Sequence, residues 1–317
     1  MAYNLNTMDV SLCVDLAPRN KRGLRLANPV IAASGTAGYG DEGFLPDIHR
    51  LGAIVCKGTT LLPREGNPQP RLAETPSGLL NAVGLENIGV RALIRDKAPT
   101  WAGWQTPVIV NIAGETVNEY AELAGLLDGV PGVAALEVNI SCPNVQAGCI
   151  EFGQDPTQAA RVTEAVRQAT SLPILVKLTP NTGDIVAVAR AVVAAGADAV
   201  SLINTVRGMA IDAKKRRPVL SSVSGGLSGP AIKPIALHMV YQVAAAVSVP
   251  VVGGGGIDSA ADALEFIMAG ATAVQIGSAA LVNRRVFTET IDGLEEYLKT
   301  EGVADIRELT GIARRAQ

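Results

Sequence analysis

The sequence of 317 residues contains few aromatic side chains: Phe, Trp and Tyr together make up 3% of it. This scarcity argues against a protein that binds single-stranded nucleic acid by stacking on its bases. Lys and Arg number 27 against 30 for Asp and Glu, so the net charge of -3 gives no electrostatic reason to expect DNA or an anionic membrane as a partner. Hydrophobic residues make up 48%, which predicts a large and mainly aliphatic core.

Metal-binding and export patterns are also scarce. The chain has 2 histidines and 4 cysteines, and no cysteine pair has CxxC spacing, so we expect no metal site. The start "MAYNLNTMDV" lacks the basic and then apolar pattern of a signal peptide. The most apolar long segment, 185–206, is interrupted by Arg190, Gly196 and Asp198, which argues against a membrane span. We therefore expect a cytoplasmic protein with free thiols.

Short apolar, β-branched segments alternate with helical patterns along the chain. The predicted strands span 30–35, 53–58, 108–114, 135–141, 174–179, 199–204, 251–256 and 273–278. The predicted helices cover about 118–128, 157–170, 184–195, 233–247, 259–269 and 287–299. Thr157 and Ser259 are the candidate N-caps. Eight such units predict an α/β protein, a (β/α)8 TIM barrel that forms a single domain over residues 1–317.

Three further segments do not fit the repeating unit. Residues 59–106 and 205–232 are too long to be plain connections, and both follow predicted strands. They should form long loops on the C-terminal face of the barrel, where long loops usually carry function. The segment "LCVDLAPRNKRGLRLANP" before the first strand predicts a small hairpin that closes the opposite end.

The C-terminal ends of the predicted strands carry lysines, amides and glycines, with no carboxylate among them. In such a barrel these positions hold the chemistry. Glycines after the last two strands predict a phosphate site, with tight turns as the alternative. Each lysine alone could extend along the rim, but the two together favour contact with an anionic ligand. The positions are Ser34, Gly35, Lys57, Gly58, Asn111, Asn139, Lys177, Asn204, Thr205, Gly255, Gly256, Gly277 and Ser278.

Asparagines gather at these ends and in the adjoining loops. An amide offers both a donor and an acceptor, so a cluster of amides suits a planar ligand with alternating C=O and N–H groups, such as a pyrimidine. A single asparagine in a loop would more often be a turn residue. The candidates are Asn81, Asn111, Asn139, Asn144 and Asn204.

Cys142 lies in "NISCPN", just beyond a predicted strand, in a loop that could close over a ligand. A thiolate can serve as a general base near neutral pH, and the alternative is an inert packed thiol. We interpret the other cysteines and the histidines as structural or incidental; they are Cys13, Cys56, Cys149, His49 and His238.

Several motifs resemble those of class 1 dihydroorotate dehydrogenases, and the resemblance extends from "ANPVIAASGT" to "QIGSAAL". The most specific are "KGTTLLPREGNPQPRL", "NAVGLEN", "NISCPN", "VKLTPN" and "GGLSGPAIKPIALHMVYQV". The last of these, with "RGMAID" before it, is similar to the 1B branch and less similar to the 1A branch. Class 2 enzymes carry serine where this chain has Cys142, and they have a membrane-associated N-terminal extension.

The resemblance implies a bound FMN and oxidation of dihydroorotate to orotate in pyrimidine biosynthesis. The cysteine would remove the C5 proton while hydride passes from C6 to the flavin. The implied cofactor residues are Ala33, Ser34, Gly35, Lys57, Gly58, Asn111, Asn139, Lys177, Ile203, Gly229, Gly255, Gly256, Gly277 and Ser278. The implied substrate residues are Lys57, Asn81, Val83, Gly84, Leu85, Asn139, Asn144, Asn204 and Thr205.

The 1B branch also implies a partner. Its members pair this subunit, as a homodimer core, with a subunit that carries FAD and an iron–sulfur cluster and passes electrons to NAD. Two residues depart from the family pattern, because Cys149 stands where glycine is usual and Ser278 where threonine is usual. The alternatives are a uracil-reducing relative similar to dihydropyrimidine dehydrogenase, a flavin-free sugar-phosphate isomerase or aldolase, and an accessory chain without catalytic activity.

Overall fold

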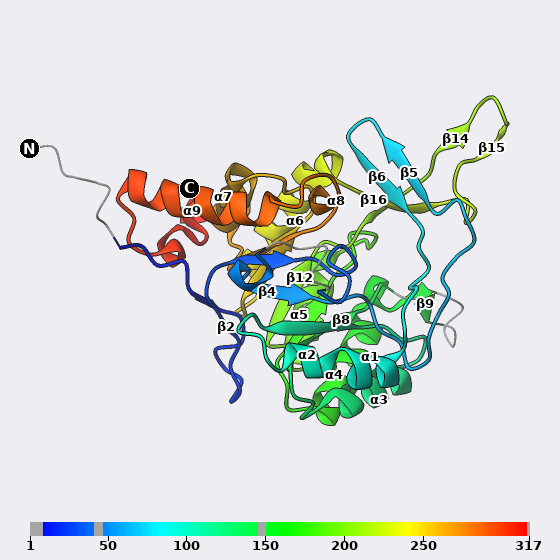
Figure 1. Cartoon of the computed structure of the whole chain (residues 1–317), viewed down its shortest axis with the longest axis horizontal. Coiled ribbons are helices and arrows are strands. Elements are labelled where there is room, and N and C mark those ends of the chain that lie inside the picture. The colour runs from blue at the N-terminus through cyan, green and yellow to red at the C-terminus, as the bar shows by residue number, and fades with distance from the viewer. Residues whose placement is uncertain (1–8, 41–46, 142, 145–149, 316–317) are drawn as a thin grey trace, which may run out of the picture.

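The computed structural model describes residues 9–40, 47–141, 143–144 and 150–315, with only the backbone described for residues 143, 144 and 150. Eight strands form a closed barrel in the order β11-β12-β17-β18-β3-β4-β7-β8, and all neighbouring pairs are parallel (Figure 1). This confirms the predicted (β/α)8 fold. The strands are β3 (Val30–Ala32), β4 (Ala53–Val55), β7 (Val108–Ile112), β8 (Val133–Asn139), β11 (Ile174–Lys177), β12 (Ala199–Leu202), β17 (Val251–Gly254) and β18 (Ala273–Ile276).

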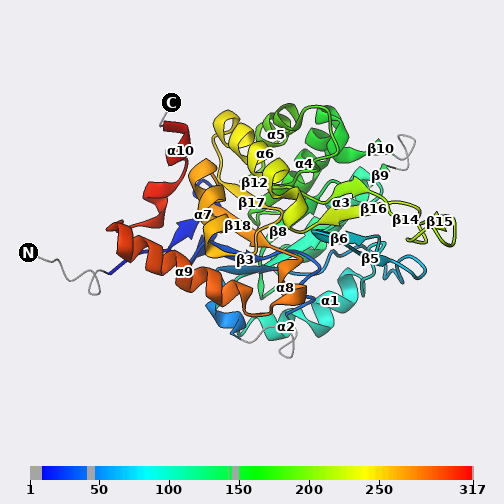
Figure 2. The ribbon, with the colours of Figure 1, turned by 90° about the horizontal axis from the view of Figure 1, so that it is seen from above.

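Helices surround the strands, as the view from above shows (Figure 2). The six predicted helices are present as α3 (Val117–Leu127), α4 (Pro156–Ala169), α5 (Ile185–Ala194), α6 (Lys233–Ala246), α7 (Ala260–Ala269) and α9 (Val286–Glu301). Shorter helices are α1 (Val90–Asp96), α2 (Ala98–Trp101), α8 (Ala279–Val282) and α10 (Ile312–Arg315). Single 3₁₀ turns are η2 (Ile48–Arg50), η4 (Phe152–Gln154), η5 (Pro230–Ile232) and η6 (Ile306–Leu309). None of the helices described is long and apolar enough to cross a membrane.

The two predicted N-caps have different outcomes. Ser259 caps α7, because its side chain accepts a hydrogen bond from the backbone N–H of Asp262. The prediction for Thr157 is wrong, since α4 begins one residue earlier, at Pro156. Asp155 is the N-cap and accepts from the N–H of Gln158. Proline suits the first helical position because its fixed φ is already helical and its missing N–H would have no partner there.

The barrel core is aliphatic, as the composition predicts. All five residues of β7 are buried, which is typical of a parallel strand that is covered on both faces. Burial of each of its Val and Ile side chains contributes about 1.5–3 kcal/mol relative to leaving it exposed. Two of the few aromatic rings, Tyr120 and Phe152, meet edge to face beside β8, with centroids 5.7 Å apart.

The predicted N-terminal hairpin is present, with β1 (Val14–Asp15) paired antiparallel to β2 (Arg25–Leu26). Its loop makes three hydrogen bonds to residues that lie just before barrel strands. Asn20 donates to Asp198 at 3.1 Å, Arg22 to Ser171 at 2.6 Å and Arg19 to Ser248 at 3.4 Å. These partners precede β12, β11 and β17, so the hairpin packs at the N-terminal end of the barrel, as predicted.

The two long segments form one small sheet, where the sequence predicts loops. Its order is β13-β16-β6-β5, and every pair is antiparallel. Figure 1 shows β5 and β6 extending from the barrel beside the hairpin β14–β15. The four strands of the sheet are β5 (Leu72–Thr75), β6 (Gly78–Asn81), β13 (Val206–Gly208) and β16 (Gly225–Ser228). The separate hairpin consists of β14 (Ile211–Asp212) and β15 (Arg217–Pro218). Because β6 and β16 are so far apart in the chain, local sequence pattern does not reveal their pairing.

Candidate active site

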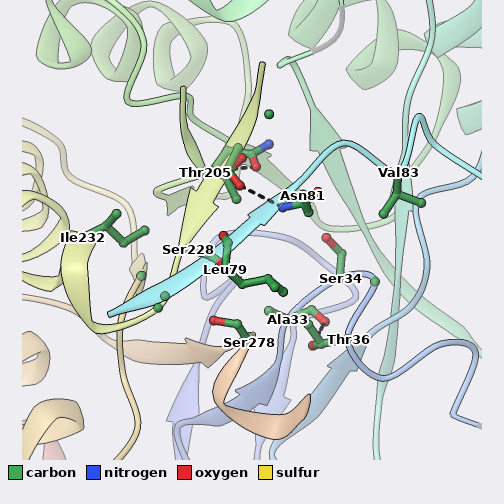
Figure 3. A pocket seen from close by; sticks show the side chains of 18 of the residues that line it. Ala33, Ser34, Thr36, Leu79, Asn81, Val83, Thr205, Ser228, Ile232 and Ser278 are labelled. Carbon is green, nitrogen blue, oxygen red and sulfur yellow. Dashed lines mark hydrogen bonds between the residues drawn. The ribbon is translucent and has the colours of Figure 1, made fainter. Parts of the chain in front are cut away.

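A cavity of about 1550 Å³ opens at the carboxyl ends of the barrel strands, between the strands and the small sheet. Figure 3 shows Leu79 of the small sheet opposite Ala33 and Ser278, which follow barrel strands. Every residue predicted to bind cofactor or substrate whose side chain the structure describes lines this cavity. The side chain of Asn144 lies outside that description, so its role remains a prediction. Their individual roles stay predictions.

The "NISCPN" loop is described only in part. Cys142 and Cys149 lie outside the described residues, so the predictions about them remain predictions. The backbone of Asn144 belongs to β9 (Pro143–Asn144), which pairs antiparallel with β10 (Ile150–Glu151). This short ladder follows β8 at the end of the barrel where the cavity opens.

Lys57 follows β4 and lines the cavity, and its side-chain ammonium group forms no hydrogen bond or ion pair with any residue that the structure describes. Burial lowers the pKa of its ammonium group, and nearby Glu86 opposes that shift. Glu86 is itself paired with Arg71 at 2.6 Å. A partly buried ammonium group without a close partner is a suitable contact for an anion.

The glycines after β17 and β18 form part of the cavity wall, and they are needed there for different reasons. Gly255 and Gly256 have φ of 125° and 78°, and a Cβ on Gly256 would lie 2.8 Å from the carbonyl oxygen of Gly229. Gly277 differs, because a Cβ there would meet only the Cβ of Ala33, at 3.7 Å. Since Ala33 also lines the cavity, the open side of Gly277 is the side that a ligand would approach.

If the cavity binds the FMN that the family resemblance implies, Gly277→Ala should lower FMN affinity about tenfold without changing the melting temperature. The added methyl group fits the fold but takes the space next to the ligand. Gly183→Ala is the matched control, since an added Cβ at Gly183 would have no atom within 4 Å and Gly183 does not line the cavity. Fluorescence titration of the apoprotein with FMN measures the effect. Equal FMN affinities in the two variants would show that Gly277 does not leave room for the bound ligand.

Asn139 and Asn204 are held together at the cavity floor. The Asn204 amide donates to Asn139 Oδ1 at 3.3 Å and to Ser141 Oγ at 2.9 Å. Asn139 Oδ1 also accepts from the backbone N–H of Ser141, so its NH2 group is the end that remains for a ligand. Tyr120 donates to the Asn139 carbonyl at 2.6 Å and fixes the end of β8.

Glu137 is a buried carboxylate that the strand-end prediction missed. It lies on β8, is fully buried, and has Lys177 Nζ 3.7 Å from its Oε1. Lys177 also donates to Ser34 Oγ at 3.3 Å. The list of strand-end residues contains no carboxylate because Glu137 lies two residues before the end of β8, deeper in the barrel. Strand alternation could have found it, because Glu137 and Asn139 are two residues apart and face the same side of β8.

Cys13, Cys56 and the two histidines do not line the cavity. Burial raises the pKa of the Cys56 thiol to about 12, so Cys56 is inert, as predicted. Cys13 is partly buried and accepts a hydrogen bond from Arg25 at 3.7 Å. His49 packs edge to face on Trp104 with centroids 6.0 Å apart, and His238 lies within α6. Within the described ranges, no group of three acidic, His or Cys side chains could hold a metal ion.

The fold and the cavity define a (β/α)8-barrel enzyme whose pocket combines glycine-lined walls with two lysines and a set of oriented amides. The sequence model of the dihydroorotate dehydrogenase family matches residues 17–298. The chain belongs to this family of oxidoreductases.

Individual relatives match over nearly their whole length. The chain is 57% identical over 295 residues to the catalytic subunit of dihydroorotate dehydrogenase B (NAD(+)) from Desulforudis audaxviator, covering 92% of this chain and 96% of the relative. The protein of the same name from Trichlorobacter lovleyi is 58% identical over 289 residues, covering 91% and 95%. That from Geobacter sulfurreducens is 54% identical over 290 residues, with the same coverage.

Proposed function

We propose that this chain is the FMN-binding catalytic subunit of a class 1B dihydroorotate dehydrogenase, formed by one domain over residues 1–317. It oxidises dihydroorotate to orotate in de novo pyrimidine biosynthesis. The main support is that residues from the ends of the barrel strands and from the small sheet, predicted separately for cofactor and substrate, surround one cavity. The names of the relatives support the same substrate and a partner subunit.

The residues present fit FMN. Gly255, Gly256, Gly277 and Ser278 offer backbone N–H groups and a hydroxyl to its phosphate, in a cradle that a side chain at position 277 would fill. Asn111 Oδ1 is buried and has no partner among the described residues, so it can accept from a ring N–H. Lys177 and Ser34 lie together at the same wall. When bound, FMN supplies the acceptor for the hydride that leaves C6 of dihydroorotate.

The chain's own residues supply binding and proton transfer. Lys57 holds the substrate carboxylate, and Asn81, Asn139, Asn144 and Asn204 hold the amide edges of the ring. Cys142 takes the proton from C5 as the general base, and the electrons of that C–H bond form the new C5=C6 double bond as hydride leaves C6. A reducing cytoplasm, which is the proposed compartment, keeps this thiol unoxidised.

The proposed partner is an FAD and iron–sulfur subunit that docks on a homodimer of this chain to give a heterotetramer. The chain alone should reduce artificial electron acceptors with dihydroorotate, because that half-reaction needs only FMN. It should reduce NAD efficiently only after the partner is added. Parallel assays of the isolated chain and the reconstituted complex test this. Efficient NAD reduction by the chain alone would refute the 1B assignment, and efficient use of fumarate would favour class 1A.

A further inference from the structure

Glu137 is fully buried inside the barrel, and donors from four other strands surround its carboxylate. Asn111 Nδ2 of β7 donates to Oε1 at 2.8 Å, and Gln275 Nε2 of β18 donates to Oε2 at 2.6 Å. Ser201 Oγ of β12 donates to Oε2 at 2.9 Å. Lys177 Nζ of β11 lies 3.7 Å from Oε1. One side chain of β8 thus connects residues of β7, β11, β12 and β18.

These contacts determine which end of each amide is available to a ligand. An ionised carboxylate only accepts, so both Asn111 and Gln275 turn their NH2 groups toward Glu137 and their oxygens away from it. Asn111 Oδ1 then lies beside Gly58, where an added Cβ would be 3.0 Å from it. Asn111, Gln275, Gly58 and Lys177 all line the cavity, whereas Glu137 and Ser201 lie behind it.

We propose that Glu137 is a positioning residue that sets the polarity of the cavity floor. It makes Asn111 and Gln275 present acceptors, and it holds the ammonium group of Lys177 beside them. Such a floor recognises a planar ring that carries an N–H donor and an electron-rich edge. The inference rests on the proposed function, because the ring that meets this floor is then the FMN ring.

Fold stability alone gives little reason for this carboxylate. A buried charge has a large desolvation cost, and well-packed apolar residues of similar volume often replace a buried ion pair without loss of stability. The position of Glu137 directly behind a ligand cavity, with every partner a donor, instead favours a role in ligand recognition.

Glu137→Gln tests the proposal, because the new amide has a donor end that must face one of the three groups donating to the carboxylate. FMN affinity of the apoprotein, measured by fluorescence quenching, should fall roughly tenfold to a hundredfold. The reduction potential of bound FMN should also shift to a more positive value, because a negative charge beside Lys177 is lost. A tenfold change in the relative affinity for reduced and oxidised FMN corresponds to about 30 mV for a two-electron couple. A purely structural role would leave this potential unchanged.

Ser201→Ala is the second variant, and it decides the question if Glu137→Gln does not fold. It removes one donor to Glu137 without touching the cavity, and we expect FMN affinity to fall several-fold. Thr163→Val is the matched control, since Thr163 is a buried hydroxyl that, among the residues described, donates to the Ala159 carbonyl within α4 and not to a group of the cavity. Its FMN affinity should equal that of the parent protein.

The possible results separate this inference from the proposed function. If the parent chain binds no FMN, the proposed function fails before any variant is compared. If the parent binds FMN and a folded Glu137→Gln keeps its affinity and potential, the positioning role is wrong. If Glu137→Gln does not fold, unchanged FMN affinity in Ser201→Ala overturns the proposal.

Discussion

Replacement of Cys142 by alanine should slow reduction of bound FMN by dihydroorotate by about 10²–10⁴-fold, the usual contribution of positioned proton transfer. FMN content and orotate affinity should change little, because the thiol acts only on the C5 proton. Cys142→Ser should also be slow near neutral pH, since an alcohol has a far higher pKa than a thiol. Its defect should ease as pH rises, whereas Cys142→Ala should stay at least as slow throughout.

Anaerobic stopped-flow measurement of flavin reduction over a range of pH tests this prediction. Cys13→Ser is the control, because Cys13 is a free thiol on the N-terminal side of the barrel, outside the cavity. It should reduce its flavin at the parental rate. If Cys142→Ala reduces flavin within a few-fold of the parent protein, Cys142 is a packing residue and another group removes the proton.

Replacement of Lys57 by alanine should weaken orotate binding about tenfold to a hundredfold, because a hydrogen bond to a charged group contributes about 1.5–3 kcal/mol. FMN retention should fall much less, since the glycine cradle and Lys177 remain. Lys57 has no ion-pair partner within the described part of the chain, so the loss falls on the ligand and not on the fold. Titration of the flavin spectrum with orotate measures the change.

The pH dependence of orotate binding gives a second test of Lys57. Burial lowers the pKa of its ammonium group, and the ammonium form is the one that binds a carboxylate. Affinity should therefore decline as pH rises through that pKa, and the decline should begin at a lower pH than an ordinary lysine would give. Lys57→Ala should lose this dependence, whereas Lys214→Ala, in the exposed β14–β15 hairpin, should behave as the parent. Parental orotate affinity in Lys57→Ala would contradict the assignment.

The barrel was predictable because its strands are continuous apolar segments that alternate with helical patterns. The small sheet was not predictable, because β6 and β16 pair across a long stretch of chain and both contain glycine. Some of the predicted strands are also too long at their C-terminal ends. The segment 251–256 ends as a strand at Gly254, because Gly255 and Gly256 adopt positive φ, which ends the extended conformation.

Much of the cavity wall was predictable because polar residues at the ends of apolar strands stand out in the sequence. Glu137 did not stand out in the same way, because it lies within the strand and its importance depends on partners from other strands. Gln275 was missed for the same reason. Arg64 and Ser228 also line the cavity, but they come from the long segments whose pairing was not predicted.

Anaerobic titration of the purified, FMN-loaded chain with dihydroorotate and, separately, with dihydrouracil tests the central claim most directly. The account predicts that dihydroorotate bleaches the visible flavin absorption and that dihydrouracil leaves it unchanged, because Lys57 selects the carboxylate that only dihydroorotate carries. A chain that takes up no flavin, or whose flavin is reduced by dihydrouracil and not by dihydroorotate, would contradict it.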